Sequence, residues 1–244
     1  MLENMSVEVV FVHGIRTSAS MWRPQLEYLA ARGVGAHAVD LPGHGTRRGE
    51  PFTLDEAFAT IDDAVQDAAN RGPVILVGHS MGGLLSLQYA GSSQTPPLAA
   101  LIGAGSTAIP RGAGLRAYRS FLRAFDALPD RGAVITDFVL SRTLPPETRD
   151  DFGAGGYAFD TQHVALAALT ELDILRALRS IRVPLWFVNG QFDQLRVNEA
   201  LFTRTVPEAE LIVVPRTSHL VTSMRPDVFN AVLHVAIATA EQTW

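Results

Sequence analysis

The sequence predicts an α/β fold built on one mostly parallel sheet of about six strands, with helices on both faces. Three observations lead to this prediction. Short apolar runs rich in β-branched residues are nearly continuous in their apolarity, which is typical of strands covered on both faces. These runs alternate with stretches of helical spacing, as in strand–helix–strand units. The alternation stops after the fourth run, between about residues 106 and 179, where helix-like segments occur without a convincing strand.

Each predicted strand is a short apolar run that ends in a loop of glycine or polar residues. In chain order the strands cover residues 7–12, 34–39, 73–77, 98–105, 184–190 and 210–215. Helices are predicted between them because apolar residues recur at intervals of three and four. Ser18 or Ser20 is suited to cap the first helix, Thr53 caps the second, and the last begins near Pro226. Ligands of such sheets bind beyond the carboxyl ends of the strands, so a site is expected in the loops that follow them.

The composition indicates a chain that buries a substantial core. Of 244 residues, 47% are hydrophobic and 18% are charged, which suits one large α/β domain or two small ones. The net charge of −5 and the lack of a dense basic stretch argue against nucleic acid and anionic membranes as partners. The chain has no cysteine, which excludes disulfides and thiolate catalysis. Because no signal peptide or membrane-length apolar run is apparent, we expect a soluble, cytoplasmic protein without a membrane span.

The residues Gly78-His79-Ser80-Met81-Gly82 form a G-x-S-x-G motif between a predicted strand and a predicted helix. A tight turn in this context strains the serine backbone and projects its hydroxyl from the end of the sheet. The two glycines are required because a Cβ at either position would clash where strand and helix nearly touch. The Met81 amide lies at a helix N-terminus, which favours negative charge. Ser80 is therefore a candidate nucleophile, and the alternative is a chance match in a glycine-rich loop.

Three further candidate features each follow a separate predicted strand. The first strand ends in His13-Gly14-Ile15-Arg16, Asp193 lies a few residues past the fifth strand, and His219 follows the last strand. A histidine of near-neutral pKa is suited to accept the proton of a serine hydroxyl. Asp193 has an alternative role as a cap of the helix that follows it. The strand before the fifth ends at residues 103–106, where no carboxylate occurs.

Together these motifs resemble the α/β-hydrolase fold family over nearly the whole chain, except in its middle. The resemblance implies a catalytic triad of Ser80, Asp193 and His219, in the chain order expected for this family. The acid would fix the histidine tautomer and stabilise the imidazolium. The resemblance also implies an oxyanion hole formed by the backbone N–H groups of Ile15 and Met81, which would stabilise the charge that develops during acyl transfer.

The resemblance assigns the interrupted middle of the chain to a helical cap, or lid, inserted after the fourth strand. Residues 107–179 would form this cap, and residues 1–106 and 180–244 would form the hydrolase core. The alternative for the middle segment is additional core packing, which we expect for most of its apolar residues. Two departures from the family are apparent. We expect the two leading antiparallel strands of many relatives to be missing, because only about five residues precede the first strand, and Arg216-Thr217-Ser218 stands where relatives often have a glycine before the histidine.

The remaining candidates near the site have less specific signals. Arg16 follows the oxyanion loop and either pairs with a substrate carboxylate, pairs with a neighbouring acid or is a solvated loop charge. Trp22 is interpreted as core, with a substrate-binding position as the alternative. His13 is interpreted as a residue that shapes its loop. Asp40 and His44 belong to a D-x-P-G-H-G turn, which favours a structural role over a catalytic pair.

The predicted function is hydrolysis of a carboxylic ester or lactone through an acyl-Ser80 intermediate, with a small molecule as substrate. We expect no cofactor, and no metal because no cluster with metal-ligand spacing occurs. One alternative is a lyase or C–C bond hydrolase of the same fold acting on an anionic substrate, which Arg16 motivates. Another is a receptor that binds a ligand in the pocket without turnover.

Overall fold

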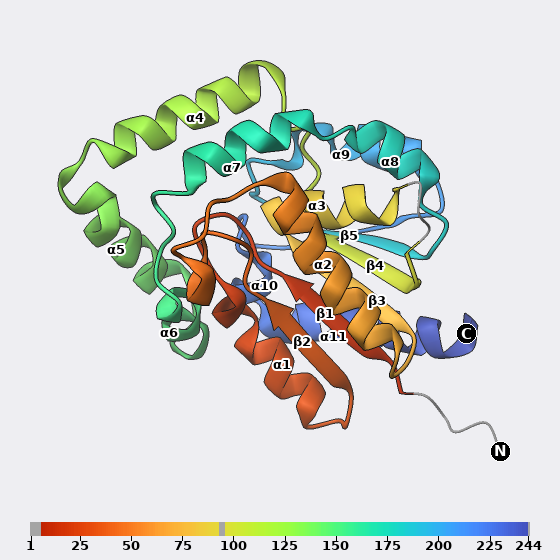
Figure 1. Ribbon diagram of the computed structural model, residues 1–244. Coiled ribbons are helices and arrows are strands. Elements are labelled where there is room, and N and C mark those ends of the chain that lie inside the picture. The colour runs from red at the N-terminus through yellow and green to blue at the C-terminus, as the bar shows by residue number, and fades with distance from the viewer. Residues whose placement is uncertain (1–5, 93–95, 244) are drawn as a thin grey trace.

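The computed structural model describes residues 6–92 and 96–243. Its centre is a six-stranded sheet in the order β2-β1-β3-β4-β5-β6, and every neighbouring pair is parallel. Figure 1 shows the strands side by side, with helices in front of and behind them. The strands are β1 (Glu8–Val12), β2 (Gly35–Val39), β3 (Val74–His79), β4 (Leu98–Ala104), β5 (Leu185–Gly190) and β6 (Glu210–Val214). The predicted parallel α/β fold is confirmed, and each predicted strand is present.

Two hydrophobic clusters cover the two faces of the sheet. One face packs against α2 (Leu54–Ala69), α3 (Met81–Ala90), α8 (Ile174–Ser180) and α9 (Glu199–Thr205). The other packs against α1 (Arg23–Ala30), α10 (Val221–Met224) and α11 (Pro226–Thr243). Successive residues of a strand belong to different clusters, as Val10 and Phe11 of β1 do, and both of these residues are fully buried. This two-sided burial is why the strand sequences are apolar throughout rather than alternating.

Strand register brings the carboxyl ends of the strands to one edge of the sheet. Val12 at the end of β1 lies opposite Gly78, and His79 at the end of β3 lies opposite Ala104. Gly190 at the end of β5 lies opposite Val214 at the end of β6. The loops that carry the predicted site residues therefore leave the sheet at the same edge, as expected for a parallel sheet.

The segment between β4 and β5 forms helices that lie over this edge of the sheet (Figure 1). They are α4 (Gly112–Asp126), α5 (Ala133–Thr143), α6 (Pro146–Ala154) and α7 (Gln162–Ala168), followed by α8. The prediction of a helical insertion after the fourth strand is confirmed. The expectation that most of its apolar residues are core is wrong for α5, where Val134 is 70% and Phe138 60% exposed. Among the described residues, the exposed apolar side chains of α5 have no further layer packed on them.

In the described residues, we find no helix that combines the length and the apolar character needed to cross a membrane.

Candidate active site

Ser80 lies in a sharp turn between β3 and α3. Its backbone has φ 54° and ψ −115°, a left-handed conformation that is rare for residues with a side chain. A Cβ at Gly78 would overlap the carbonyl oxygen of Gly82, and a Cβ at Gly82 would overlap that of His13. The strained turn and the two glycine contacts agree with the expectation from the motif. The serine side chain is consequently presented at the end of the sheet on a rigid support.

The structure brings the three predicted triad side chains together from three loops. The Ser80 hydroxyl lies 2.8 Å from His219 Nε2. His219 Nδ1 lies 3.0 and 3.1 Å from the two carboxylate oxygens of Asp193. A carboxylate only accepts, so Nδ1 carries the proton and donates to Asp193, which leaves Nε2 free to accept from the serine hydroxyl. This is the tautomer that a histidine needs in order to take a proton from serine.

The Asp193 side chain has no solvent exposure. Burial alone raises the pKa of a carboxyl, but hydrogen bonds from His219 and from the Leu195 N–H, at 2.7 Å, outweigh it. The pKa of Asp193 is therefore lowered, and the group is ionised at neutral pH. A buried carboxylate in this position stabilises a positive charge on the adjacent imidazole.

The loop that carries His219 explains the missing family glycine. Arg216 has φ 58°, in the left-handed region where a glycine is free of strain. The loop is fixed instead by contacts with the loop after β5. The Thr217 carbonyl accepts from the Phe192 N–H at 2.8 Å, and Gly190 leaves room for the Ser218 carbonyl, which a Cβ would overlap. These contacts hold the loop that carries His219 although Arg216 stands at a position that favours glycine.

The two proposed oxyanion amides lie next to Ser80. Ile15, Ser80 and Met81 line one pocket. Met81 is the first residue of α3, so its N–H has no partner inside the helix. In the described part of the chain, no acceptor is assigned to the Ile15 N–H either. Both amides are available to a bound group, while their role in an oxyanion hole stays a prediction.

His13, Asp40 and His44 are engaged in the structure of their turn. His13 Nδ1 donates to the Gly14 carbonyl at 2.7 Å, and its Nε2 accepts from the Leu41 N–H at 3.0 Å. Burial, followed by the proximity of His44, lowers the pKa of His13 to about 3. Asp40 accepts from the backbone of Ala19 at 2.8 Å. The structural interpretation of these residues agrees with their contacts.

The pocket in front of Ser80 has a volume of about 390 Å³, within the range of small-molecule sites. It lies between α3, the loop after β4, α4, α7 and the loop after β5. Its lining is almost entirely apolar, and the polar side chains are Ser80, Gln194 and Tyr118. Burial raises the pKa of Tyr118, so its hydroxyl is neutral. None of the described lining residues is charged at neutral pH. A larger groove of about 910 Å³ between β2 and α2 contains none of the predicted site residues.

Arg16 and Trp22, the two possible substrate-binding residues, both lie outside the pocket lining. The Arg16 guanidinium stacks on the Phe159 ring, 4.5 Å from its centroid. Burial lowers its pKa, so Arg16 is not simply a solvated loop charge. Trp22 as a substrate-binding residue is wrong. It is fully buried between Phe11 and Phe229, on the opposite face of the sheet from the pocket.

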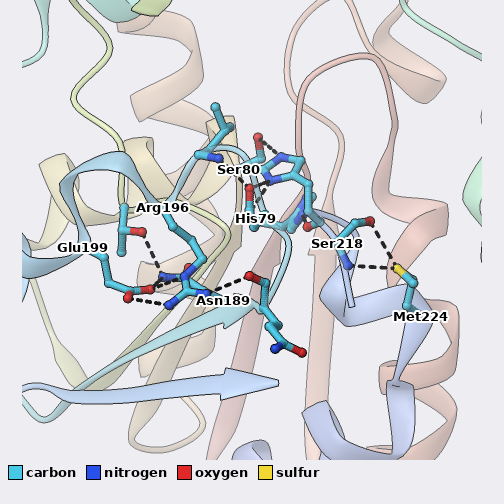
Figure 2. Close-up of polar contacts among 12 residues, drawn as sticks. His79, Ser80, Asn189, Arg196, Glu199, Ser218 and Met224 are labelled. Carbon is cyan, nitrogen blue, oxygen red and sulfur yellow. Dashed lines mark hydrogen bonds and ion pairs between the residues drawn. The ribbon is translucent and has the colours of Figure 1, made fainter. Parts of the chain in front are cut away.

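A buried polar network that the sequence reasoning missed braces the Asp193 loop. The Asn189 side chain at the end of β5 donates to Thr107 at 2.9 Å and to Glu199 at 2.7 Å. Arg196 also donates to Glu199 at 2.7 Å. Figure 2 shows Asn189, Arg196 and Glu199 grouped on one side of Ser80, with Ser218 and Met224 on the other. The available signal was the polar Asn189 at the end of an otherwise apolar strand.

His79, the second residue of the motif, was also missed. It is buried, and its Nε2 lies 2.9 Å from the backbone oxygen of His219. The sequence offers no signal for this contact, because the two residues are 140 positions apart.

Comparisons with known proteins support one family. Residues 9–232 match the family model described as "Alpha/beta hydrolase family". The chain is 31% identical over 206 residues to the pimeloyl-[acyl-carrier protein] methyl ester esterase of Xanthomonas oryzae pv. oryzae, with 77% of each chain covered. It is 37% identical over 95 residues to the (E)-2-((N-methylformamido)methylene)succinate hydrolase of Acinetobacter baylyi, covering 36% of this chain and 33% of that protein. Several other curated relatives are likewise matched over a third to a half of their length.

Solved structures share the fold. E-2-(acetamidomethylene)succinate hydrolase superposes with a TM-score of 0.74 at 22% identity, covering 96% of this chain and 92% of that chain. A thermophilic esterase from Thermogutta terrifontis superposes with a TM-score of 0.77 at 21% identity, covering 97% and 91%. At these identities the likeness concerns the fold alone.

Proposed function

The chain belongs to the alpha/beta hydrolase family, and from this premise we propose that it is a serine hydrolase of neutral carboxylic esters or lactones. The observation that carries the proposal is the contact of 2.8 Å between the Ser80 hydroxyl and His219 Nε2, with buried Asp193 behind the histidine. Ser80 lies at the end of an apolar pocket that has room for a small molecule.

In the first half of the proposed reaction, His219 Nε2 takes the Ser80 proton as Oγ attacks the substrate carbonyl carbon. The carbonyl oxygen becomes an oxyanion, which accepts hydrogen bonds from the amides of Ile15 and Met81. One such donor typically contributes 10²–10³-fold to kcat. The tetrahedral intermediate then collapses, the carbon–oxygen bond of the leaving group breaks, and His219 returns the proton to the departing alkoxide. An acyl ester on Ser80 remains.

In the second half, a water molecule attacks the acyl carbon while His219 Nε2 removes one of its protons. The second tetrahedral intermediate releases Ser80, which recovers its proton from His219. The products are an alcohol and a carboxylic acid, or a hydroxy acid when the substrate is a lactone. Asp193 stays ionised throughout and stabilises the imidazolium in both halves, in keeping with its lowered pKa.

The lining of the pocket supports a neutral, apolar substrate group. A carboxylate inside this pocket would lose its hydration without gaining a cationic partner from the lining. Arg16, the residue that motivated an anionic substrate, stacks on Phe159 instead. The two curated relatives described above are named as an esterase and a hydrolase, which supports hydrolysis. No observation specifically favours a receptor.

We also propose that residues 107–179 act as a cap on a hydrolase core of residues 1–106 and 180–244. The support is that α4 and α7 contribute Leu115, Phe121 and Leu166 to the pocket lining. Within that range α8 packs on α3, and the helices that contribute to the pocket lining are α4 and α7.

The test is turnover of p-nitrophenyl esters, together with labelling of the protein by a serine-directed phosphonate. We expect a burst of nitrophenol from the wild type, a phosphonate attached to Ser80 by mass spectrometry, and neither in Ser80→Ala. Ser92→Ala serves as a matched surface control. Undiminished turnover by Ser80→Ala, or a label on a different residue, would contradict the proposal.

A matched pair of substrates tests whether the pocket prefers a neutral acyl group to a charged one. We expect an alkyl ester to be hydrolysed at least about tenfold faster, as kcat/KM, than the analogue with a terminal carboxylate on its acyl chain, because the pocket offers no cation. Preference for the carboxylate, reduced by Arg16→Gln and unchanged by Arg48→Gln, would instead favour the anionic alternative. Binding of these compounds without turnover would favour a receptor.

A further inference from the structure

His79 lies between the loops that would carry out the proposed reaction. Its ring is buried next to Ser80, and its centroid is 4.9 Å from that of His219. On its other side it packs against Gly14, where an added Cβ would come within 2.8 Å of His79 Nδ1. One side chain therefore contacts both the loop with the proposed oxyanion amide and the loop with the proposed base.

The hydrogen bond of His79 defines its protonation state. Its Nε2 lies 2.9 Å from the backbone oxygen of His219, which only accepts, so Nε2 carries a proton. Its Nδ1 is buried and, among the described residues, has no partner, so a second proton there would be unsatisfied. Burial, and next the proximity of His219, lower the pKa of His79 to about 3. The ring is therefore a neutral donor at physiological pH and is itself unsuited to act as a general base.

This hydrogen bond acts on the backbone of the proposed base. In the described chain, the His79 ring is the donor assigned to the His219 carbonyl. The His219 side chain has to hold two contacts at once, with Ser80 at 2.8 Å and with Asp193 at 3.0 Å. A rotation or shift of the His219 backbone would break one of them.

Resting on the proposed function, we infer that His79 is a positioning residue, which holds the His219 backbone so that its imidazole reaches Ser80. His79 touches neither substrate nor the transferred proton, and it acts through His219. Misplacement of a reacting group by about 1 Å can lower the rate of the chemical step about 10²-fold, so loss of this contact is expected to lower kcat and leave KM nearly unchanged.

Three substitutions separate the hydrogen bond from packing. In His79→Gln the amide nitrogen is the same number of bonds from Cβ as Nε2, so it can donate to the His219 carbonyl. In His79→Asn the amide nitrogen takes the place of Nδ1 and faces Gly14. His79→Phe keeps the ring without a donor, and His234→Phe is the control for substitution of an exposed histidine. We measure kcat and KM with a p-nitrophenyl ester, and folding by near-ultraviolet circular dichroism.

We expect kcat to fall about 10–10²-fold in His79→Asn and His79→Phe, with KM within about threefold of wild type, and His79→Gln to recover most of the loss. Wild-type kcat in His79→Phe, or a loss in folded His79→Gln equal to that in His79→Asn, would overturn the inference. Where the variants do not fold, ¹⁵N chemical shifts of the wild-type His79 ring decide. A protonated Nε2 and bare Nδ1 support the inference, and the opposite tautomer overturns it. Because Ser80→Ala tests the proposed function separately, failure of one is distinguishable from failure of the other.

Discussion

The loops after β1, β3, β5 and β6 and the helices α4 and α5 lie at the same edge of the sheet but are constructed differently. In the loops, polar side chains are buried and held by hydrogen bonds, as His79, Asn189 and Asp193 are. In α4 and α5, large apolar side chains such as Phe121 and Phe138 are more than half exposed. The loops are held by a few specific hydrogen bonds, whereas the helices present apolar side chains that are only partly covered. Substitutions should therefore affect chemistry in the first region and substrate choice in the second.

The largest expected effect tests the loop region through Asp193→Asn. The amide cannot stabilise the imidazolium and favours the wrong histidine tautomer, so kcat should fall about 10⁴-fold while the protein stays folded. Steady-state kinetics with a p-nitrophenyl ester measure the loss. Asp150→Asn, an exposed position on α6, is the matched control. A loss below about tenfold would remove Asp193 from the proposed triad.

A smaller loss is expected from Gly14→Ala. The new Cβ would lie 2.8 Å from His79 Nδ1 and 3.3 Å from Ser80 Cβ, so the loop of Ile15 has to move. Displacement of one oxyanion donor should lower kcat about 10²–10³-fold. Gly49→Ala, whose Cβ meets no atom within 4 Å, is the control. Equal kcat values in the two variants would indicate that the oxyanion lies elsewhere.

The helical region is tested by Leu166→Phe on α7. The larger side chain narrows the pocket, so kcat/KM for long acyl chains should fall about 10–100-fold, with a much smaller change for acetyl esters. A series of p-nitrophenyl esters from acetyl to decanoyl measures the shift. A uniform loss at all chain lengths would mean that Leu166 affects the chemistry and not the choice of substrate, and would break the comparison.

The buried histidines of the loop region predict a pH-dependent stability. His13 and His79 have pKa values lowered from 6.5 to about 3 in the folded protein. Between these values the unfolded chain binds more protons, so the free energy of unfolding falls as the pH is lowered from 6.5. Each histidine contributes up to about 1.4 kcal/mol per pH unit. Urea unfolding from pH 7 to 5 measures how steeply the free energy of unfolding depends on pH. His79→Gln removes one of the two histidines, so it should reduce the part of this slope that His13 and His79 contribute by up to half. An unchanged slope in that variant would contradict the assignment.

The smallest effect is expected on the outer side of the helical region. Phe138→Ser should change the free energy of unfolding by no more than about 0.5 kcal/mol, since the ring is 60% exposed. Phe187→Ala, in a strand where the ring is fully buried, should cost about 3–5 kcal/mol. Denaturant unfolding compares them. A large loss in Phe138→Ser would mean that this surface is covered in solution.

The same contrast explains what the sequence made predictable. Ser80, Asp193 and His219 each follow a strand with an unmistakable apolar run, so their order and their common edge of the sheet followed from elementary rules, and their side chains do lie together. Trp22 was ambiguous because helical spacing does not reveal which face of the sheet a residue meets. Phe138 was expected to be core because apolar spacing does not reveal whether another layer is present.

Contacts between loops that are distant in the sequence could not be predicted from it, for a related reason. The bond from His79 to the His219 carbonyl depends on how two loops approach in space, and neither local spacing nor residue type encodes that approach. The catalytic roles of the triad and of the two amides stay predictions until the variants above are measured.

The backbone of Ser80, with φ 54°, lowers the thermal stability of the protein. Glycine adopts that conformation freely, so Ser80→Gly should relax the turn and raise the melting temperature while removing the hydroxyl. The serine at this position therefore lowers the thermal stability of the turn, a cost that its proposed role as nucleophile would require.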